Sequence, residues 1–167
     1  MTELELKRAP QDRRLYALDG VGTLRSDGLF SSNWSAEAGG RSWRLTRRGF
    51  WSRRVQAIDT AGVVVGEFEP NAVRRGGKLR WNGRELTLRA ASSWRERYAL
   101  AGGDRELAVL DGKGWGSRPV KVTVVVEPDA VEPGLLLFAA FVVRGLARDA
   151  DGSAGGGAAV IASSSGT

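Results

Sequence analysis

The sequence gathers arginine and aromatic residues in two short segments, and these are its strongest candidates for binding chemistry. The first, RSWRLTRRGFWSRR, begins at Arg41, and the second, AVRRGGKLRWNGR, ends at Arg84. An arginine fork binds phosphate oxygens with two hydrogen bonds, and tryptophan favours the level of lipid headgroups. The residues expected to form an anionic-lipid site are Arg44, Arg47, Arg48, Arg53, Arg54, Arg74, Arg75, Lys78 and Arg80.

Other interpretations fit the same residues. Arginines that alternate along strands can simply solvate the outside of a barrel, in which case the domain is a structural or protein-interaction module without a small ligand. Arginine and tryptophan together can also hold nucleic acid, by phosphate contacts and base stacking. This is the less favoured ligand, because the tryptophans are scattered as core anchors would be, among them Trp34, Trp94 and Trp115.

The chain contains no histidine and no cysteine, which removes most catalytic and metal-binding chemistry. Zinc, copper and iron sites lose their preferred ligands, and histidine-dependent nucleophile systems cannot form. An enzyme would need a cluster of carboxylates, for which Asp59, Glu67 and Glu69 are the candidates. We therefore expect a non-enzymatic protein without a cofactor or a metal.

The elements that must position the arginines are short strands, which occupy most of the chain from Leu15 to Glu127. Glycine accounts for 23 of the 167 residues, about twice its usual share, as tight turns require. Asn82-Gly83 is the clearest hairpin turn, and the strand after it alternates apolar and polar residues from Glu85 to Arg89. Four valines at period two predict the last strand, from Val120 to Val126.

One apolar segment, EPGLLLFAAFVVRGLARDADG, predicts a helix after these strands. Nine consecutive apolar residues run from Leu135 to Val143, Pro133 suits a first helical turn, and the acidic stretch from Asp149 to Gly152 is expected to end the helix. A helix of 12 to 15 residues is too short to span a bilayer, which needs about 20. Being apolar on every side, it must be buried on every side. We therefore predict a closed antiparallel barrel of about 12 strands around one buried C-terminal helix.

Two finer features are predicted inside this barrel. Leu45 and Arg54 have counterparts at an offset of 43 residues, which two related meanders or chance would produce. The same offset places Glu96 where Arg53 lies, so a buried Arg53–Glu96 pair is a hypothesis for a clasp between strands.

The domain limits follow from composition. Residues 1–152 are expected to form a single domain with its central helix at about 134–148, and residues 153–167, rich in glycine, serine and alanine, a flexible tail. The N-terminal segment lacks the apolar stretch of a secretory signal. We expect a cytoplasmic protein without a transmembrane span, peripheral at the inner membrane surface if it binds lipid.

The order of elements resembles that of the tubby-like superfamily, which includes tubby C-terminal domains, phospholipid scramblases and LURP-one-related proteins. The resemblance covers roughly Trp43 to Asp151 and is carried by WRLTRRGFWSRR and by EPGLLLFAAFVVRGLARDAD. It implies a barrel around a central helix and a phosphoinositide-like headgroup as ligand, without assigning any residue of this chain to it. The acidic calcium-binding segment of scramblases is not recognisable, so calcium-dependent lipid transport is not expected.

Overall fold

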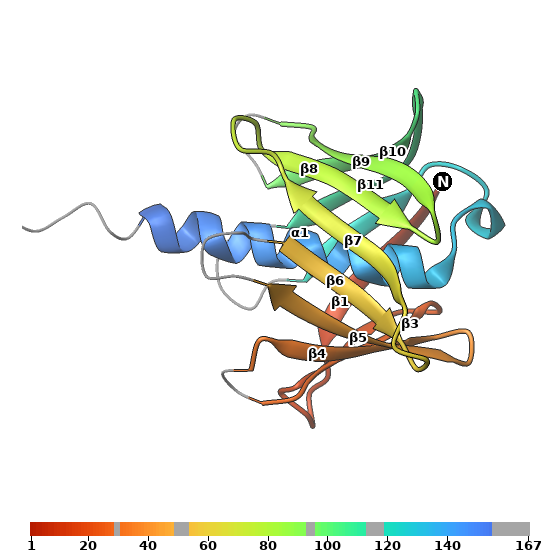
Figure 1. The fold of residues 1–167 in the computed structure, drawn as a ribbon, viewed down its shortest axis with the longest axis vertical. Helices are drawn as coiled ribbons and strands as arrows, with labels where there is room; N and C mark the ends of the chain where they lie inside the picture. The colour runs from red at the N-terminus through yellow and green to blue at the C-terminus, as the bar shows by residue number, and fades with distance from the viewer. Residues whose placement is uncertain (29–30, 49–53, 93–95, 113–118, 155–167) are drawn as a thin grey trace, which may run out of the picture.

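The computed structural model of the chain describes residues 1–28, 31–48, 54–92, 96–112 and 119–154. Within these residues, twelve strands form a closed antiparallel barrel and a C-terminal helix runs through its interior (Figure 1). This confirms the predicted fold class. Strands adjacent in sequence pair with one another, and β1 (Thr2–Arg8) closes the ring by pairing with β12 (Val120–Val124). The strands between them are β2 (Leu15–Leu18), β3 (Gly22–Ser26), β4 (Asn33–Ala38), β5 (Arg41–Arg48), β6 (Arg54–Asp59), β7 (Val64–Pro70), β8 (Gly76–Trp81), β9 (Arg84–Ala90), β10 (Arg97–Gly102) and β11 (Arg105–Gly112).

The strands alternate between the interior and the surface as their sequences predict. In β9, Leu86 and Leu88 are buried, while Glu85 and Thr87 are exposed. The alternate valines of β12 are at most 4% exposed. The predicted hairpin between β8 and β9 is also confirmed, because Asn82 (φ 48°) and Gly83 (φ 77°) both have the left-handed backbone that a type I′ turn requires.

The strands β4 to β7 and β8 to β11 form two similar meanders. β4 and β8 have the same bounds at an offset of 43 residues, and so do β6 and β10. The pairing register shifts between Ala57 and Ile58 in the first meander and between Leu100 and Ala101 in the second, again at that offset. The predicted internal similarity therefore extends from residue matches to strand bounds and bulges, which supports two related meanders over chance.

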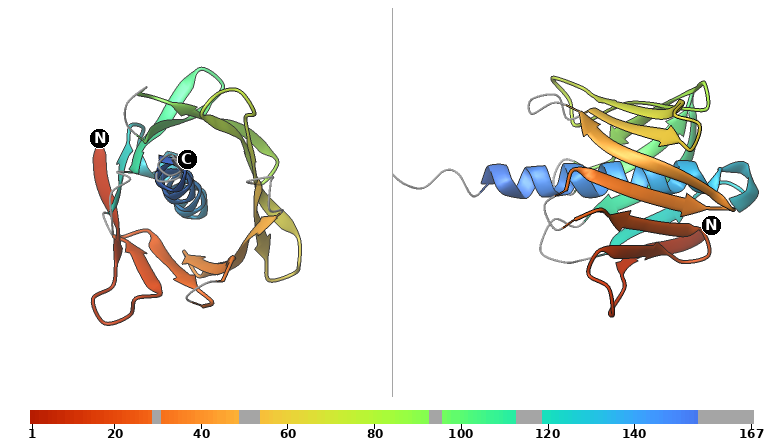
Figure 2. Two further views of the ribbon diagram at one scale, coloured as in Figure 1. Left: turned by 90° about the vertical axis from the view of Figure 1, so that its left-hand side faces the viewer. Right: turned by 60° about the horizontal axis from the view of Figure 1, so that its bottom comes forward.

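The helix α1 (Pro133–Ala154) fills the barrel from end to end (Figure 2). Every residue from Leu135 to Val143 is at most 4% exposed, because strands surround this part of the helix on all sides. It packs against β3, β4, β7, β11 and β12. In the described part of the chain, no helix combines the length and the apolar character needed to cross a bilayer.

The end of the helix differs from the prediction. The helix was expected to stop at Asp149–Gly152, but it continues through these residues to Ala154. Aspartate and glycine have low helix propensity but do not block the helical backbone as proline does, and Asp149 forms an ion pair with Arg47 of the barrel wall. Ser153 and Ala154 thus belong to the helix, and the remainder of the predicted tail, residues 155–167, lies outside the described residues.

The start of the helix is fixed to the wall by Glu132. Its carboxylate oxygen Oε2 accepts hydrogen bonds from Trp81 Nε1 at 2.9 Å and from Asn82 Nδ2 at 3.0 Å. Both donors lie at the turn between β8 and β9, so one carboxylate connects that turn to the first residue of α1.

Replacing Glu132 with alanine is expected to lower the free energy of unfolding by about 1 kcal/mol, because both hydrogen bonds lose their charged acceptor and water can replace it only in part. Chemical denaturation of the variant measures this. Glu127→Ala, which removes another exposed carboxylate from the same connection, is the matched control and should change stability by less than about 0.5 kcal/mol. Equal losses in the two variants would contradict a specific role for Glu132.

Candidate functional site: the basic mouth

The strand connections at the two ends of the barrel differ in charge. At the end where α1 begins, the strand connections are residues 19–21, 39–40, 60–63, 82–83, 103–104 and 125–132. The charged residues of these connections are all acidic, Asp19, Asp104, Glu127, Asp129 and Glu132, and the strands that follow three of the connections begin with Arg41, Arg84 and Arg105. We call this end the acidic mouth.

The opposite end, where α1 leaves the barrel, is rich in arginine, and we call it the basic mouth. Its arginines come from two connections, 9–14 and 71–75, from the ends of strands, and from the last turns of the helix. Among the described residues they are Arg8, Arg13, Arg14, Arg47, Arg48, Arg74, Arg75, Arg97, Arg144 and Arg148. The described acidic residues of the same connections, strand ends and emerging helix are fewer: Asp12, Asp27, Glu69, Glu96, Asp111, Asp149 and Asp151.

A pocket of about 320 Å³ opens at the basic mouth between the helix and the strands, and we call it the Arg144 pocket. It lies where α1 meets the ends of β4 and β5. Its lining consists of Ser31, Ser32, Trp34, Arg47, Phe141, Arg144, Gly145, Arg148 and Asp149. Three arginines against one aspartate leave this lining positively charged.

Arg144 is partly buried and is held by aromatic side chains. Its Nη2 donates a hydrogen bond to the Tyr16 hydroxyl at 2.8 Å, and its guanidinium lies 4.4 Å from the centre of the Tyr16 ring and 4.9 Å from that of Trp34. Among the described residues no carboxylate forms an ion pair with it. Hydrogen bonding and ring contacts therefore orient this cation without neutralising its charge.

The surroundings of Arg144 lower the pKa of its guanidinium. Burial is the main cause that lowers the pKa of the Arg144 guanidinium. The nearby charges of Arg148 and Arg47 lower that pKa further, while the Tyr16 hydroxyl acts in the opposite direction. Because an arginine stays protonated at neutral pH, the result is a positive charge in an unfavourable setting, which an anion would relieve.

Arg47 forms the wall of the pocket opposite Arg144. It shares the inward face of β5 with Trp43 and Leu45, and it pairs with Asp149 of the helix at 3.6 Å. Its guanidinium lies directly on Gly145, where a Cβ atom would collide with it. Arg148, one turn of helix after Arg144, is exposed at the rim.

A second pocket at the basic mouth contains a neutralised cluster. Arg75 forms an ion pair with Glu96, whose Oε2 accepts a hydrogen bond from the Tyr98 hydroxyl at 2.6 Å. The predicted partner of Glu96, Arg53, lies outside the described residues, so that pair stays a hypothesis. Since Glu96 already has a cation beside it, this pocket is a weaker candidate for an anion than the Arg144 pocket.

The structure divides the predicted lipid-binding residues between two places. Arg47, Arg48, Arg74 and Arg75 lie at the basic mouth. Arg44, Lys78 and Arg80 lie on the outer wall, and Arg54 lies between the two, at the start of β6. Arg53 is outside the described residues.

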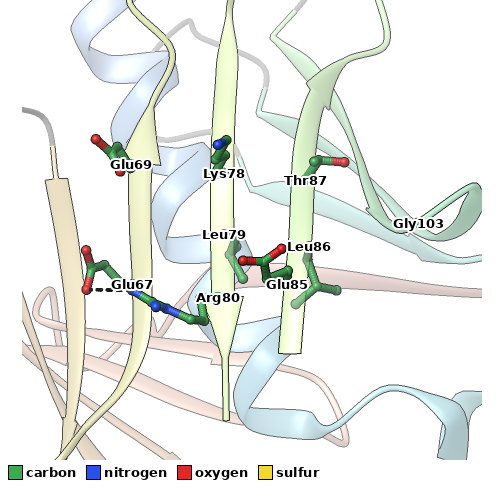
Figure 3. A pocket seen from close by; sticks show the side chains of 9 residues that line it. All are labelled: Glu67, Glu69, Lys78, Leu79, Arg80, Glu85, Leu86, Thr87 and Gly103. Carbon is green, nitrogen blue, oxygen red and sulfur yellow. Dashed lines mark ion pairs between the residues drawn. The ribbon is translucent and has the colours of Figure 1, made fainter. Parts of the chain in front are cut away.

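The outer wall does not form a continuous basic surface. Arg54 pairs with Glu69 at 2.5 Å, and Arg80 pairs with Glu67 at 3.5 Å. A depression of about 420 Å³ over β7, β8 and β9 has three glutamates and only two cations in its lining (Figure 3). For these wall residues, the ion pairs favour the interpretation that arginines solvate the outside of the barrel.

Burial and turn geometry bear on the predicted tryptophans and on Asp59. Trp34, Trp43 and Trp81 are at most 9% exposed, so the core interpretation is confirmed for them, and Trp43 and Trp81 cannot insert at the level of lipid headgroups. The candidates Trp94 and Trp115 lie outside the described residues. Asp59 accepts hydrogen bonds from the backbone N–H groups of Ala61 and Val63, which identifies it as a turn residue.

The carboxylates proposed for an enzyme thus have other partners, Asp59 in its turn and Glu67 and Glu69 in ion pairs. Within the described residues, no group of three or more potential ligands is placed to hold a metal ion. What the basic mouth can do chemically is bind an anion, through fixed guanidinium groups and exposed arginines around them.

Sequence reasoning missed Arg144 and Arg148 as site residues. The signal was present, because Arg144 directly follows nine apolar residues of a helix that must be buried. A charge in such a position requires a special environment, which here is the opening of the barrel.

The fold and the pocket define a closed barrel with a central helix and a cationic opening at one end. No family model matches this chain, and neither a curated protein nor a solved structure does. The resemblance to the tubby-like superfamily accordingly stays a prediction.

Proposed function

We propose that this chain is a non-enzymatic domain that binds anionic phospholipid headgroups at a membrane surface, with the basic mouth as the face in contact. The observation that carries the proposal is the charge difference between the two ends of the barrel. At one end the connections carry five acidic residues beside three arginines at strand starts, whereas at the other end the described arginines outnumber the carboxylates. Such a dipolar domain would orient itself near an anionic surface.

The expected affinity of the basic mouth for an anionic membrane is moderate. Each arginine close to an anionic membrane contributes about 1 kcal/mol, and this contribution falls off within a Debye length of about 8 Å at physiological salt. Several arginines at one mouth would therefore give a reversible attachment that weakens with added salt. The predicted resemblance to the tubby-like superfamily, whose tubby domains bind phosphoinositides, supports the same class of ligand.

Nucleic acid is the less favoured ligand. Stacking on bases needs exposed aromatic rings, and Trp34, Trp43 and Trp81 are all buried.

A protein-interaction module without a small ligand remains the alternative from another class of function. It is the outcome to consider if the protein does not bind vesicles.

Co-sedimentation with vesicles tests the proposal, with neutral phosphatidylcholine compared with mixtures that contain phosphatidylglycerol. Two triple variants remove the same number of positive charges. The mouth variant carries Arg13→Gln, Arg74→Gln and Arg148→Gln, and the wall variant carries Arg44→Gln, Lys78→Gln and Arg80→Gln. We expect the mouth variant to lose tenfold or more in affinity and the wall variant less than threefold.

The affinity of the unmodified protein for anionic vesicles should also fall strongly as salt is raised from about 50 mM to about 300 mM, a range that includes the physiological value. Equal losses in the two triple variants would show that net charge matters and the mouth does not. Absence of binding to all anionic vesicles would overturn the proposal.

A further inference from the structure

The Arg144 pocket differs from the rest of the basic mouth because its central cation is fixed. Tyr16 and Trp34 cover the Arg144 guanidinium, and one hydrogen bond sets its rotation. An exposed arginine on a flexible stem loses side-chain entropy when it binds a ligand, whereas Arg144 is already ordered. The pocket therefore has the preorganisation that a specific site needs.

The guanidinium also keeps donors for a ligand. Of its five N–H groups, one is used by the Tyr16 hydroxyl, and no other side chain or backbone acceptor within the described residues takes the rest. Ser31 adds a donor at the same pocket, because its Oγ accepts the backbone N–H of Asn33 at 3.0 Å and its own hydroxyl hydrogen is left to donate. An oxyanion is the ligand that can accept several such bonds at once.

The charge of the pocket favours a doubly charged ligand. Among the described lining residues, Asp149 is the one carboxylate beside Arg47, Arg144 and Arg148, and it pairs with Arg47 at 3.6 Å. Arg144 and Arg148 therefore supply the excess positive charge of the pocket. The pocket volume of about 320 Å³ is much larger than the roughly 30 Å³ that a water molecule occupies. A phosphate monoester, with two charges and three terminal oxygens, fits this excess better than a phosphodiester with one charge.

We propose that the Arg144 pocket binds the terminal phosphate of a phosphate monoester, with Arg144 as the fixed fork and Arg148 as the cation at the rim. The inference rests on the proposed function, because it names the kind of headgroup that the basic mouth would select. The same chemistry occurs in a lipid such as phosphatidic acid and in soluble phosphate esters. The experiments below distinguish these two sources.

The first experiment is calorimetric titration of the protein with glycerol 3-phosphate at constant ionic strength, with sodium sulfate as comparison. The second ionisation of a phosphate monoester occurs near pH 6, so the doubly charged form is about tenfold scarcer at pH 5 than at pH 7. The chain has no histidine or cysteine, the side chains that most often titrate in this range. We expect affinity for glycerol 3-phosphate to fall about tenfold at pH 5 and affinity for sulfate, which keeps both charges, to stay constant.

Variants locate the binding. Arg144→Lys keeps one positive charge but lacks the planar fork and its stacking on Tyr16 and Trp34, and we expect it to bind at least tenfold more weakly. Arg148→Gln is at an exposed position that leaves the fold intact, and a several-fold loss is expected. Arg80→Gln, on the outer wall, is the matched control and should bind like the unmodified protein. If Arg144→Lys fails to fold, Arg148→Gln compared with Arg80→Gln decides.

The second experiment compares vesicles containing phosphatidic acid with vesicles containing phosphatidylglycerol, matched for surface charge. Tighter binding to phosphatidic acid that Arg144→Lys abolishes would assign the site to a lipid headgroup. Binding of glycerol 3-phosphate without binding to any vesicle would keep the pocket and overturn membrane docking. Equal binding to both vesicles, with no heat from glycerol 3-phosphate or with the same affinity in all variants, would overturn the pocket and keep membrane docking.

Discussion

Replacing Phe138 with alanine is expected to lower the free energy of unfolding by about 3–5 kcal/mol, a large part of the 5–15 kcal/mol typical of a whole domain. Phe138 lies near the middle of the buried run of α1, Leu135 to Val143, and is 1% exposed. Its ring centre is 5.5 Å from that of Trp81 in the barrel wall. Because strands surround the helix, the wall cannot move inward on one side to fill the space, and most of the cavity should remain.

Equilibrium denaturation in urea measures the effect, and tryptophan fluorescence provides a second probe because Trp81 borders the cavity. Arg148→Ala is the control, since it shortens a side chain on the same helix at an exposed position and should change stability by less than about 0.5 kcal/mol. A loss below about 1 kcal/mol for Phe138→Ala would mean that the helix is not packed inside the barrel as described.

The architecture could be predicted because two local patterns leave few solutions. A run of nine apolar residues from Leu135 demands burial on every side, and it is too short for a bilayer. Strands at period two, separated by turn residues, are what can surround it. The extent of the helix was predicted less well, because the ion pair between Asp149 and Arg47 joins residues about 100 positions apart and has no local signature.

The candidate site was predicted in part. Composition located the arginines but could not tell which of them have carboxylate partners across the strands, as Arg80 has with Glu67 in register on β7 and β8. Strand alternation does place Arg47 on the same face as Trp43 and Leu45, so its inward position was accessible from the sequence. The segregation of charge between the two ends was accessible as well, because in a meander alternate connections lie at the same end.

The basic mouth also explains why the apolar helix carries a charge. An arginine within the buried run from Leu135 to Val143 would need a buried partner, and its desolvation would cost several kcal/mol. At Arg144 the helix has reached the opening, where Tyr16 and Trp34 provide ring faces and the head of the side chain can reach the pocket. Arg144 therefore lies at the point along the helix where α1 leaves the barrel.

Replacing Gly76 with alanine is expected to cost about 3 kcal/mol or more, whereas Gly83→Ala should cost only about 1 kcal/mol. Both glycines have a left-handed backbone, with φ of 102° and 77°, so both variants carry backbone strain. At Gly83 no atom lies within 4 Å of the added Cβ, but at Gly76 the Cβ would overlap the carbonyl oxygen of Leu88 on β9. The difference between the two free energies of unfolding thus isolates close backbone packing between β8 and β9.

The same pair of variants separates the two mouths in function. Gly76 directly follows the connection that carries Arg74 and Arg75, and its carbonyl accepts the backbone N–H of Asn71 at 2.9 Å, which closes that connection. Gly83 lies at the acidic mouth. Under conditions in which both variants are folded, Gly76→Ala should therefore also weaken binding to anionic vesicles, while Gly83→Ala should bind as the unmodified protein does. Equal losses of stability would contradict the close packing at Gly76, because the added methyl group meets a neighbouring strand at Gly76 and open space at Gly83. Equal vesicle binding by both variants would contradict the assignment of binding to the basic mouth, because the two substitutions disturb opposite ends of the barrel.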